Sequence, residues 1–293
     1  MISLDKKDAA RKAVFTDNAY AMYATGELRP PPAALENAGY DLLFWLNAHD
    51  ISEQKFYGYI AVSRADPGEY VLSIRGTQTF QEWLLDFASI PVPFKAAPHG
   101  GFVALGFVRI FESFEFIEKA TGASMSLAGA AASLRAVKSL LITGHSLGAA
   151  LATLAAAQLA MNNTAGLRDK ILSMTFASPR VGLRDFAQAF NESLTSHRIW
   201  NALDIVPEFP TFPFIHVGGH GDRLIQTEQQ LTALTITPGC EHSLFSYQWL
   251  LDPFGFALED KCASFGRMGP KSVPDPGQAA GRRAMAEALA ENP

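Results

Sequence analysis

The chain has 293 residues, of which 48% are hydrophobic and 18% charged, and its formal net charge is −5. This composition is typical of a globular protein with a large buried core, and it disfavours a nucleic-acid partner, because binding to phosphate backbones needs clustered Lys and Arg. The sequence contains no run of 18 apolar residues, so no transmembrane anchor is predicted. The first residues, MISLDKKDAARKA, lack the apolar core of a secretory signal. We expect a protein that is cytoplasmic, that is secreted by a non-classical route, or from which a leader has been removed.

Hydrophobic periodicity and turn residues predict an alternation of helices and strands. In chain order the predicted elements are one or two helices in residues 4–26, a break at Pro30-Pro31-Pro32, a helix at 40–48, strands at 56–63 and 70–74 joined by a turn at 66–68, a helix at 106–120, a strand at 140–143, a helix at 146–161, a strand at 171–177, a helix at 185–190, strands at 197–201 and 214–217, and a helix at 242–251. This alternation favours an α/β core, with a mostly parallel central sheet flanked by helices. We expect one domain over residues 1–269 and a peripheral tail, rich in Pro and Gly, over residues 270–293.

Cysteine is scarce, because Cys240 and Cys262 are the only two in the chain. Two cysteines at this separation could form a disulfide. Free thiols are nevertheless the default expectation for a chain without a secretory signal.

The segment Gly144-His145-Ser146-Leu147-Gly148 lies between an apolar strand and an alanine-rich helix. A Gly-x-Ser-x-Gly sequence in this context is typical of a nucleophile elbow, a tight turn that exposes the serine hydroxyl above the sheet. Side chains two positions away from the serine would collide in such a turn, so we expect the two glycines to keep that space open. The amides at the start of the following helix would suit a developing oxyanion.

A serine hydroxyl is a poor nucleophile unless a base takes its proton. That base is usually a histidine, which a carboxylate holds in the required tautomer. In folds that carry a nucleophile elbow, the three residues follow the chain order Ser, then Asp or Glu, then His. Asp204 follows a predicted strand and lies among apolar neighbours, where an unpaired charge would be costly. We therefore expect Asp204 to have a partner.

The histidines that follow Ser146 differ in their suitability as the base. His197 precedes Asp204, His216 lies in a strand-like segment, and His220 lies in a glycine-rich turn. His242 comes late in the chain and follows a loop, as the role requires, so we select it.

Five segments resemble the class 3 lipases, a family with the α/β-hydrolase fold that includes the fungal triacylglycerol lipases. They occur in the family's order within residues 56–251: SIRGTQTFQEWLLDF, LLITGHSLGAALATLAA, TFASPRVGLRDFA, NALDIVP and EHSLFSY. The resemblance implies that Ser146 is the nucleophile, Asp204 the orienting acid and His242 the base, as the chemistry also selects. It further implies an oxyanion hole made by Thr77, through its backbone N–H and hydroxyl, and by the N–H of Leu147.

By the same resemblance, Asp86 holds the Thr77 hydroxyl through a hydrogen bond, and residues 79–85 take the place of a short lid helix. Phe80, Trp83 and Leu84 would form one apolar face of that helix. The alternative is a fixed helix of the core.

We expect a serine carboxylester hydrolase, and specifically a lipase that cleaves acylglycerols through an acyl-enzyme. The expected partners are a lipid or other ester substrate and, transiently, a lipid–water interface, and no metal or organic cofactor is implied. Phospholipase A1 and feruloyl-type esterase activities remain alternatives, because the depth of the pocket decides between them. The element that lines the acyl groove could be residues 99–102 or residues 103–107. A non-catalytic lipid-binding domain is disfavoured, since all three triad residue types are in place.

Overall fold

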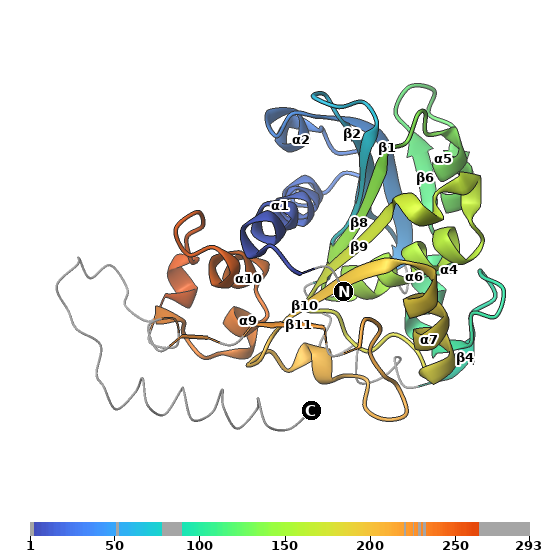
Figure 1. The fold of residues 1–293 in the computed structure, drawn as a ribbon. Helices are drawn as coiled ribbons and strands as arrows, with labels where there is room; N and C mark the ends of the chain where they lie inside the picture. Colours follow the sequence, from blue (N-terminus) through green and yellow to red (C-terminus); the bar gives the residue numbers. More distant parts are fainter. Residues whose placement is uncertain are drawn as a thin grey trace.

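A nine-stranded sheet organises the chain in the computed structural model, which describes residues 3–50, 53–77, 90–219, 221–224, 226–227, 230 and 233–263 (Figure 1). The strand order is β11-β10-β9-β8-β3-β2-β1-β6-β7. The strands are β1 (Tyr40–Asp50), β2 (Glu53–Ser63), β3 (Glu69–Ile74), β6 (Glu115–Glu118), β7 (Ser124–Met125), β8 (Ser139–His145), β9 (Ile171–Phe176), β10 (Thr195–Asn201) and β11 (Asp222–Leu224). A separate hairpin pairs β4 (Pro91–Pro93) with β5 (Phe102–Ala104).

The sheet has a parallel part and an antiparallel part. The neighbours β3, β8, β9, β10 and β11 run parallel, whereas β2, β1, β6 and β7 continue the sheet in antiparallel pairs. Strand β8 is buried from Leu140 to His145, as expected for a parallel strand that is covered on both faces. The carboxyl ends of the parallel strands therefore meet at one edge, where ligands bind in sheets of this type.

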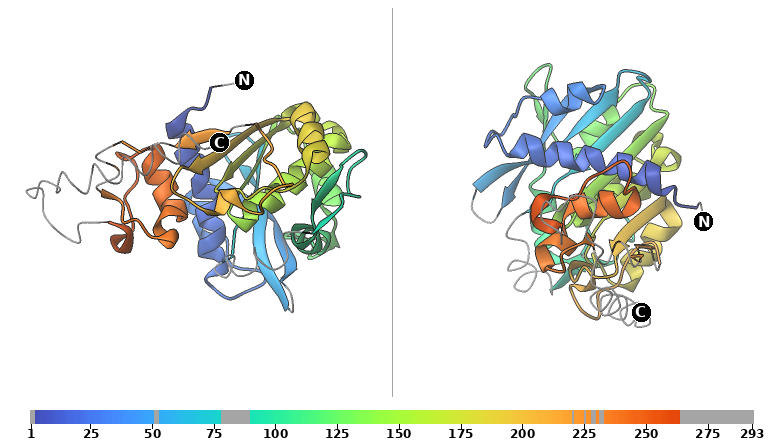
Figure 2. Two further views of the ribbon diagram at one scale, coloured as in Figure 1. Left: turned by 90° about the horizontal axis from the view of Figure 1, so that it is seen from below. Right: turned by 90° about the vertical axis from the view of Figure 1, so that its left-hand side faces the viewer.

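Helices cover both faces of the sheet (Figures 1 and 2). On one face, α1 packs against β2, β3 and β8 and lies beside α10, while on the other face α6 packs against β3, β8 and β9, with α4 and α7 beside it. No helix in the described part of the chain is long and apolar enough to cross a bilayer. The α-helices are α1 (Lys6–Tyr23), α2 (Ala33–Asn37), α4 (Leu105–Glu112), α5 (Leu127–Ser133), α6 (Leu147–Met161), α7 (Arg184–Ser193), α9 (Pro238–Glu241) and α10 (Leu244–Leu251), and the 3₁₀-helices are η1 (Thr164–Gly166), η2 (Arg168–Lys170), η3 (Val206–Glu208) and η4 (Asp260–Cys262).

The prediction of an α/β core is confirmed, as are most of the predicted elements from β2 to α7. The helix predicted at 40–48 is wrong, because this segment forms β1 between β2 and β6. Its alternate residues are buried, as in a strand, namely Leu42, Phe44, Leu46 and Ala48. The intervening side chains include Leu43 and Trp45, which are also apolar, so the two-residue period was hidden in the sequence.

The helix predicted at 106–120 is correct only in its first half. Helix α4 ends at Glu112, and the Ser113 hydroxyl donates to Ile110 O and accepts from His49 N. Residues 115–118 then pair with β1 as strand β6. Phe116 and Ile117, which suggested a longer helix, belong to this strand, whose tertiary pairing overrides local propensity.

Two later predictions also needed correction. Residues 214–217 do not form the predicted strand and contribute only a single β-bridge, between Ile215 and Gly182. Gly218 and Gly219 then turn the chain with positive φ angles. The strand beside β10 is instead β11. The helix predicted at 242–251 begins only at Leu244, as α10, so His242 lies between α9 and α10. The predicted tail over residues 270–293 lies outside the described residues.

The default expectation of free thiols is wrong. Cys240 in α9 and Cys262 in η4 form a disulfide, and both residues are buried. The bond closes the loop that contains α10 and fixes the end of α9 against residues near the end of the described chain. The first residues of the sequence therefore did not indicate the state of these cysteines.

We predict that the Cys240→Ala/Cys262→Ala double variant loses about 2–4 kcal/mol of unfolding free energy, since the unfolded chain is no longer constrained by the cross-link. Urea denaturation followed by circular dichroism measures this loss. Wild-type protein unfolded in reducing agent is the control, because it keeps both sulfur atoms and lacks only the bond. Equal stability of oxidised and reduced wild type would contradict the prediction.

Candidate active site

The nucleophile elbow joins β8 to α6. Ser146 lies between them with φ 60° and ψ −128°, a backbone conformation that L-residues rarely adopt. A Cβ atom on Gly144 would lie 2.3 Å from the carbonyl oxygen of Gly148, and one on Gly148 would lie 2.2 Å from that of Ile74. The predicted reason for the two glycines is confirmed, because backbone occupies the space that side chains would need.

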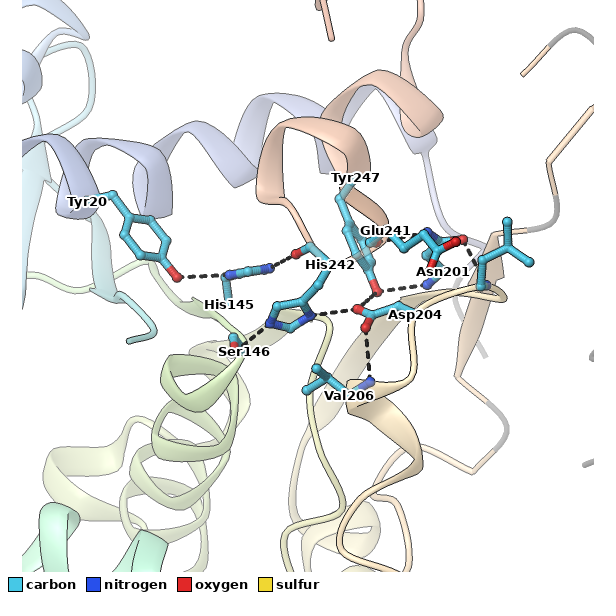
Figure 3. Close-up of polar contacts among 10 residues, drawn as sticks. Tyr20, His145, Ser146, Asn201, Asp204, Val206, Glu241, His242 and Tyr247 are labelled. Carbon is cyan, nitrogen blue, oxygen red and sulfur yellow. Dashed lines mark hydrogen bonds and ion pairs between the residues drawn. The ribbon is translucent and has the colours of Figure 1, made fainter. Parts of the chain in front are cut away.

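The structure brings Ser146, His242 and Asp204 together from three separate parts of the chain (Figure 3). Nε2 of His242 lies 2.7 Å from the Ser146 hydroxyl, and Nδ1 lies 2.8 Å from Oδ2 of Asp204. A carboxylate only accepts hydrogen bonds, so Nδ1 carries the proton and Nε2 accepts from the serine. This is the tautomer that a general base requires.

Asp204 is buried and accepts hydrogen bonds from three directions. Besides His242, Oδ2 accepts from the Tyr247 hydroxyl at 2.9 Å, and Oδ1 accepts from Val206 N at 3.0 Å. Burial and the Asp204 charge raise the pKa of Tyr247 well above its usual value, so the phenol remains a donor. The carboxyl group is thus held in a fixed orientation by three hydrogen-bond donors despite its burial.

Asn201, at the carboxyl end of β10, connects the surroundings of Asp204 to those of His242. Its side-chain amide donates to Glu241 O at 2.9 Å, and its backbone N–H donates to the Tyr247 hydroxyl at 2.9 Å. The residue before His242 and the phenol beside Asp204 are therefore held by the same asparagine. Its side-chain oxygen accepts from Leu203 N at 3.2 Å.

His145, the residue before the nucleophile, lies against the base. The two imidazole rings are 4.8 Å apart, and Nε2 of His145 lies 2.8 Å from His242 O. Burial, with a smaller effect of His242, lowers the pKa of His145 well below its usual value, so the ring is neutral. The backbone of the base is therefore fixed on the side that faces the elbow.

The two predicted oxyanion donors are Leu147, at the start of α6, and Thr77, in the segment after β3. Leu147 is the first residue of α6, where backbone N–H groups have no partner within the helix. Thr77 is half-buried and follows β3 by three residues. Gly76, the residue before Thr77, approaches Ser146 so closely that an added Cβ would lie 2.9 Å from Cβ of Ser146. The segment that carries Thr77 is therefore next to the serine.

The histidines that were set aside lie elsewhere. His197 on β10 has its Nδ1 2.8 Å from Oδ2 of Asp222. Nδ1 of His216 is buried, and this desolvation, together with the charge of Arg198, lowers the pKa of that ring well below its usual value. His220 lies outside the described residues.

The predicted lid over residues 79–85, with Phe80, Trp83 and Leu84, also lies outside the described residues, and so does Asp86. The roles assigned to them stay predictions. The sequence interpretation overlooked Tyr247 and Asn201. Tyr247 stands five residues after His242 and Asn201 three before Asp204, so both lay within segments already singled out.

The sequence matches known proteins in two ways. Residues 71–214 match the model of the family described as Lipase (class 3). The chain is 33% identical over 224 residues to a protein named phospholipase A1-II 3 and 30% identical over 226 residues to phospholipase A1-II 6, both from Oryza sativa subsp. japonica. Each match covers 67% of this chain and 52% or 53% of the relative. The chain thus spans about half the length of these curated relatives.

Solved structures share the fold at low sequence identity. A triacylglycerol lipase whose catalytic centre is described as a serine protease triad gives a TM-score of 0.60 at 19% identity, covering 78% of this chain and 83% of that one. Lipase II from Rhizopus niveus gives 0.57 at 21% identity, covering 72% and 77%. The predicted α/β-hydrolase fold is confirmed. The match of the family model over residues 71–214 and the 33% identity over 67% of this chain show that it belongs to the class 3 lipase family.

Proposed function

We propose that this protein is a serine hydrolase that cleaves the acyl ester bonds of lipids. The observation that carries the proposal is the hydrogen-bonded sequence Ser146, His242 and Asp204, with 2.7 Å and 2.8 Å between the bonded atoms. A nucleophile, a base of the correct tautomer and an orienting carboxylate are the parts that acyl transfer needs.

In the first half of the reaction, Ser146 Oγ attacks the ester carbonyl carbon while His242 Nε2 takes its proton. The carbonyl oxygen becomes an oxyanion, which the N–H groups of Leu147 and Thr77 stabilise. Loss of one such donor typically costs about 3–4 kcal/mol of transition-state stabilisation. Collapse of the intermediate breaks the bond to the alcohol, which receives the proton from His242 and leaves an acyl group on Ser146.

In the second half, water replaces the alcohol. His242 takes a proton from the water as its oxygen attacks the acyl carbon, and the protonated histidine then returns a proton to Ser146 Oγ. The free fatty acid departs. Asp204 remains ionised throughout and stabilises the imidazolium that forms in each half.

An apolar loop beside the acid favours a lipid substrate presented at an interface. Ile205 directly follows Asp204 and is 54% exposed, and Phe212 on the same loop is 89% exposed. Arg180 holds this loop through two contacts. Its backbone N–H donates to Phe209 O at 2.7 Å, and its guanidinium forms an ion pair with the Glu208 carboxylate. Exposed apolar side chains on a fixed loop next to a catalytic site are suited to contact with lipid.

Within this class, triacylglycerols are the substrate that the sequence favoured, and glycerophospholipids are the second candidate. The specific observation in favour of phospholipids is the 30–33% identity to rice proteins named phospholipase A1-II. A series of p-nitrophenyl esters from short to long acyl chains, run beside triacylglycerol and phosphatidylcholine, separates the two. Faster release of fatty acid from phosphatidylcholine than from triacylglycerol would favour the second candidate.

We predict that an organophosphonate labels wild-type protein once, at Ser146, and that Ser146→Ala is not labelled. Ester turnover in the variant should fall by about 10⁵–10⁶-fold, since loss of a triad nucleophile leaves only the contribution of binding and the oxyanion hole. Mass spectrometry of the labelled protein and initial rates on p-nitrophenyl butyrate measure these effects.

Ser173→Ala is the matched control, because Ser173 is equally buried but lies in the interior of β9. It should retain labelling and turnover. Folded wild-type protein that is neither labelled nor active would remove the proposal of a serine hydrolase and leave the lipid-binding alternative.

We predict that Phe212→Ser weakens the free energy of partitioning onto phosphatidylcholine vesicles by about 1–2 kcal/mol. The loss is smaller than for full burial of a phenylalanine, because a loop at an interface inserts only part of the side chain into the lipid. Vesicle co-sedimentation measures the partitioning. Phe254→Ser is the control, since Phe254 is 98% exposed but lies in the turn after α10. Equal losses in the two variants would show that the loop after Asp204 has no special role.

A further inference from the structure

A chain of hydrogen bonds crosses the site behind the nucleophile and does not involve the three triad side chains. Figure 3 shows its links from Tyr20 to His145 and from His145 to the backbone of His242. The Tyr20 hydroxyl lies 2.9 Å from Gly76 N and 2.9 Å from Nδ1 of His145, and Nε2 of His145 lies 2.8 Å from His242 O. One phenol thus connects the residue before Thr77 to the backbone of the base.

The chemistry of the groups fixes the direction of every bond in this chain. A carbonyl can only accept, so His145 Nε2 carries the proton and donates to His242 O. The neutral imidazole must then accept at Nδ1, and the donor is the Tyr20 hydroxyl. That hydroxyl in turn accepts from Gly76 N–H. Burial raises the pKa of Tyr20 to about 12, consistent with a phenol that remains protonated.

Tyr20 is itself held rigidly. It belongs to α1, whose apolar side packs under β2, β3 and β8. From the same helix, the Tyr23 ring lies 3.4 Å from the Arg75 guanidinium, which also donates to Phe56 O at 2.8 Å. A Cβ on Gly76 would come within 2.6 Å of the phenol oxygen, so the glycine permits this approach.

We propose that Tyr20 is a positioning residue that sets the oxyanion segment and the general base at a fixed separation, acting through Gly76 on one side and His145 on the other. The inference rests on the proposed function. Thr77 is bonded directly to Gly76 along the chain, and His242 offers its carbonyl to His145, so a shift of either partner changes the geometry in which the serine reacts. Tyr20 precedes residues 71–214, so it lies outside the segment that the family model matches.

The alternative is that Tyr20 only adds stability. The two roles separate in their kinetics, because misplacement of reacting groups lowers kcat more than it alters KM. We expect Tyr20→Phe to lower kcat on p-nitrophenyl butyrate by about 10- to 100-fold, with KM changed by less than about threefold. The rate of Ser146 labelling by the organophosphonate should fall in parallel.

Tyr59→Phe is the matched control. Its buried hydroxyl donates to Phe15 O of the same helix at 2.7 Å, but the tyrosine is not part of the chain to His145. The two variants lose the same atom beside α1, so comparable thermal midpoints with a fall of kcat in Tyr20→Phe alone would support the inference. In a His145→Ala background, Tyr20→Phe should lower kcat by less than about a further twofold. The reason is that His145→Ala already removes the hydrogen bonds that connect Tyr20 to the backbone of His242.

An unchanged kcat in folded Tyr20→Phe, beside an active wild type, would overturn this inference alone. Equal losses in Tyr20→Phe and Tyr59→Phe would also overturn it, in favour of a structural role. If Tyr20→Phe does not fold, His145→Asn breaks the same chain at its link to His242, and an unchanged kcat there would have the same meaning. A folded wild type without turnover or labelling would overturn the proposed function, and this inference with it.

Discussion

The backbone conformation of Ser146 is the constraint on which the rest of the site depends. Its φ of 60° and ψ of −128° lie in a sparsely populated region, and such strain persists only where the surroundings impose it. Here the parallel pairing of β3 with β8 places Ile74 beside Gly144, and the carbonyl of Ile74 leaves no room for a side chain on Gly148. The turn therefore exists because two strands and a helix meet with only backbone between them.

His242, the proposed base, is held by its backbone as much as by its side chain. Three consecutive residues are fixed by different parts of the fold: Cys240 by the disulfide, Glu241 by the Asn201 amide and His242 by the His145 ring. The end of α9 and the residue that follows it would otherwise be free to move, which would disturb the distance to the serine. Preorganisation of this kind means that little reorganisation remains for the moment of reaction.

The triad and the parallel part of the sheet could be predicted because their signals are local. A buried strand, a Gly-x-Ser-x-Gly turn and an alanine-rich helix are adjacent in sequence, and the order of acid and base follows from the fold. Strand β1 could not be identified in this way, since apolar residues on both of its faces hide the strand period. The disulfide depends on how α9 and η4 meet in space, which the spacing of two cysteines does not determine. Tyr247 and Asn201 act through contacts whose partners are distant in sequence.

The residues that form and hold the site come from both inside and outside the segment that the family model matches. The elbow and the acid lie within residues 71–214, whereas the base, the disulfide and α1 lie outside this range. Residues before and after the matched segment return to one place, where α1 lies beside α10 across the face of β8 (Figure 2). A site assembled from both ends of the chain cannot be complete until both have packed. The geometry that brings Ser146, His242 and Asp204 within hydrogen-bond distance is therefore a property of the tertiary fold, although the three residues are recognisable from short stretches of sequence.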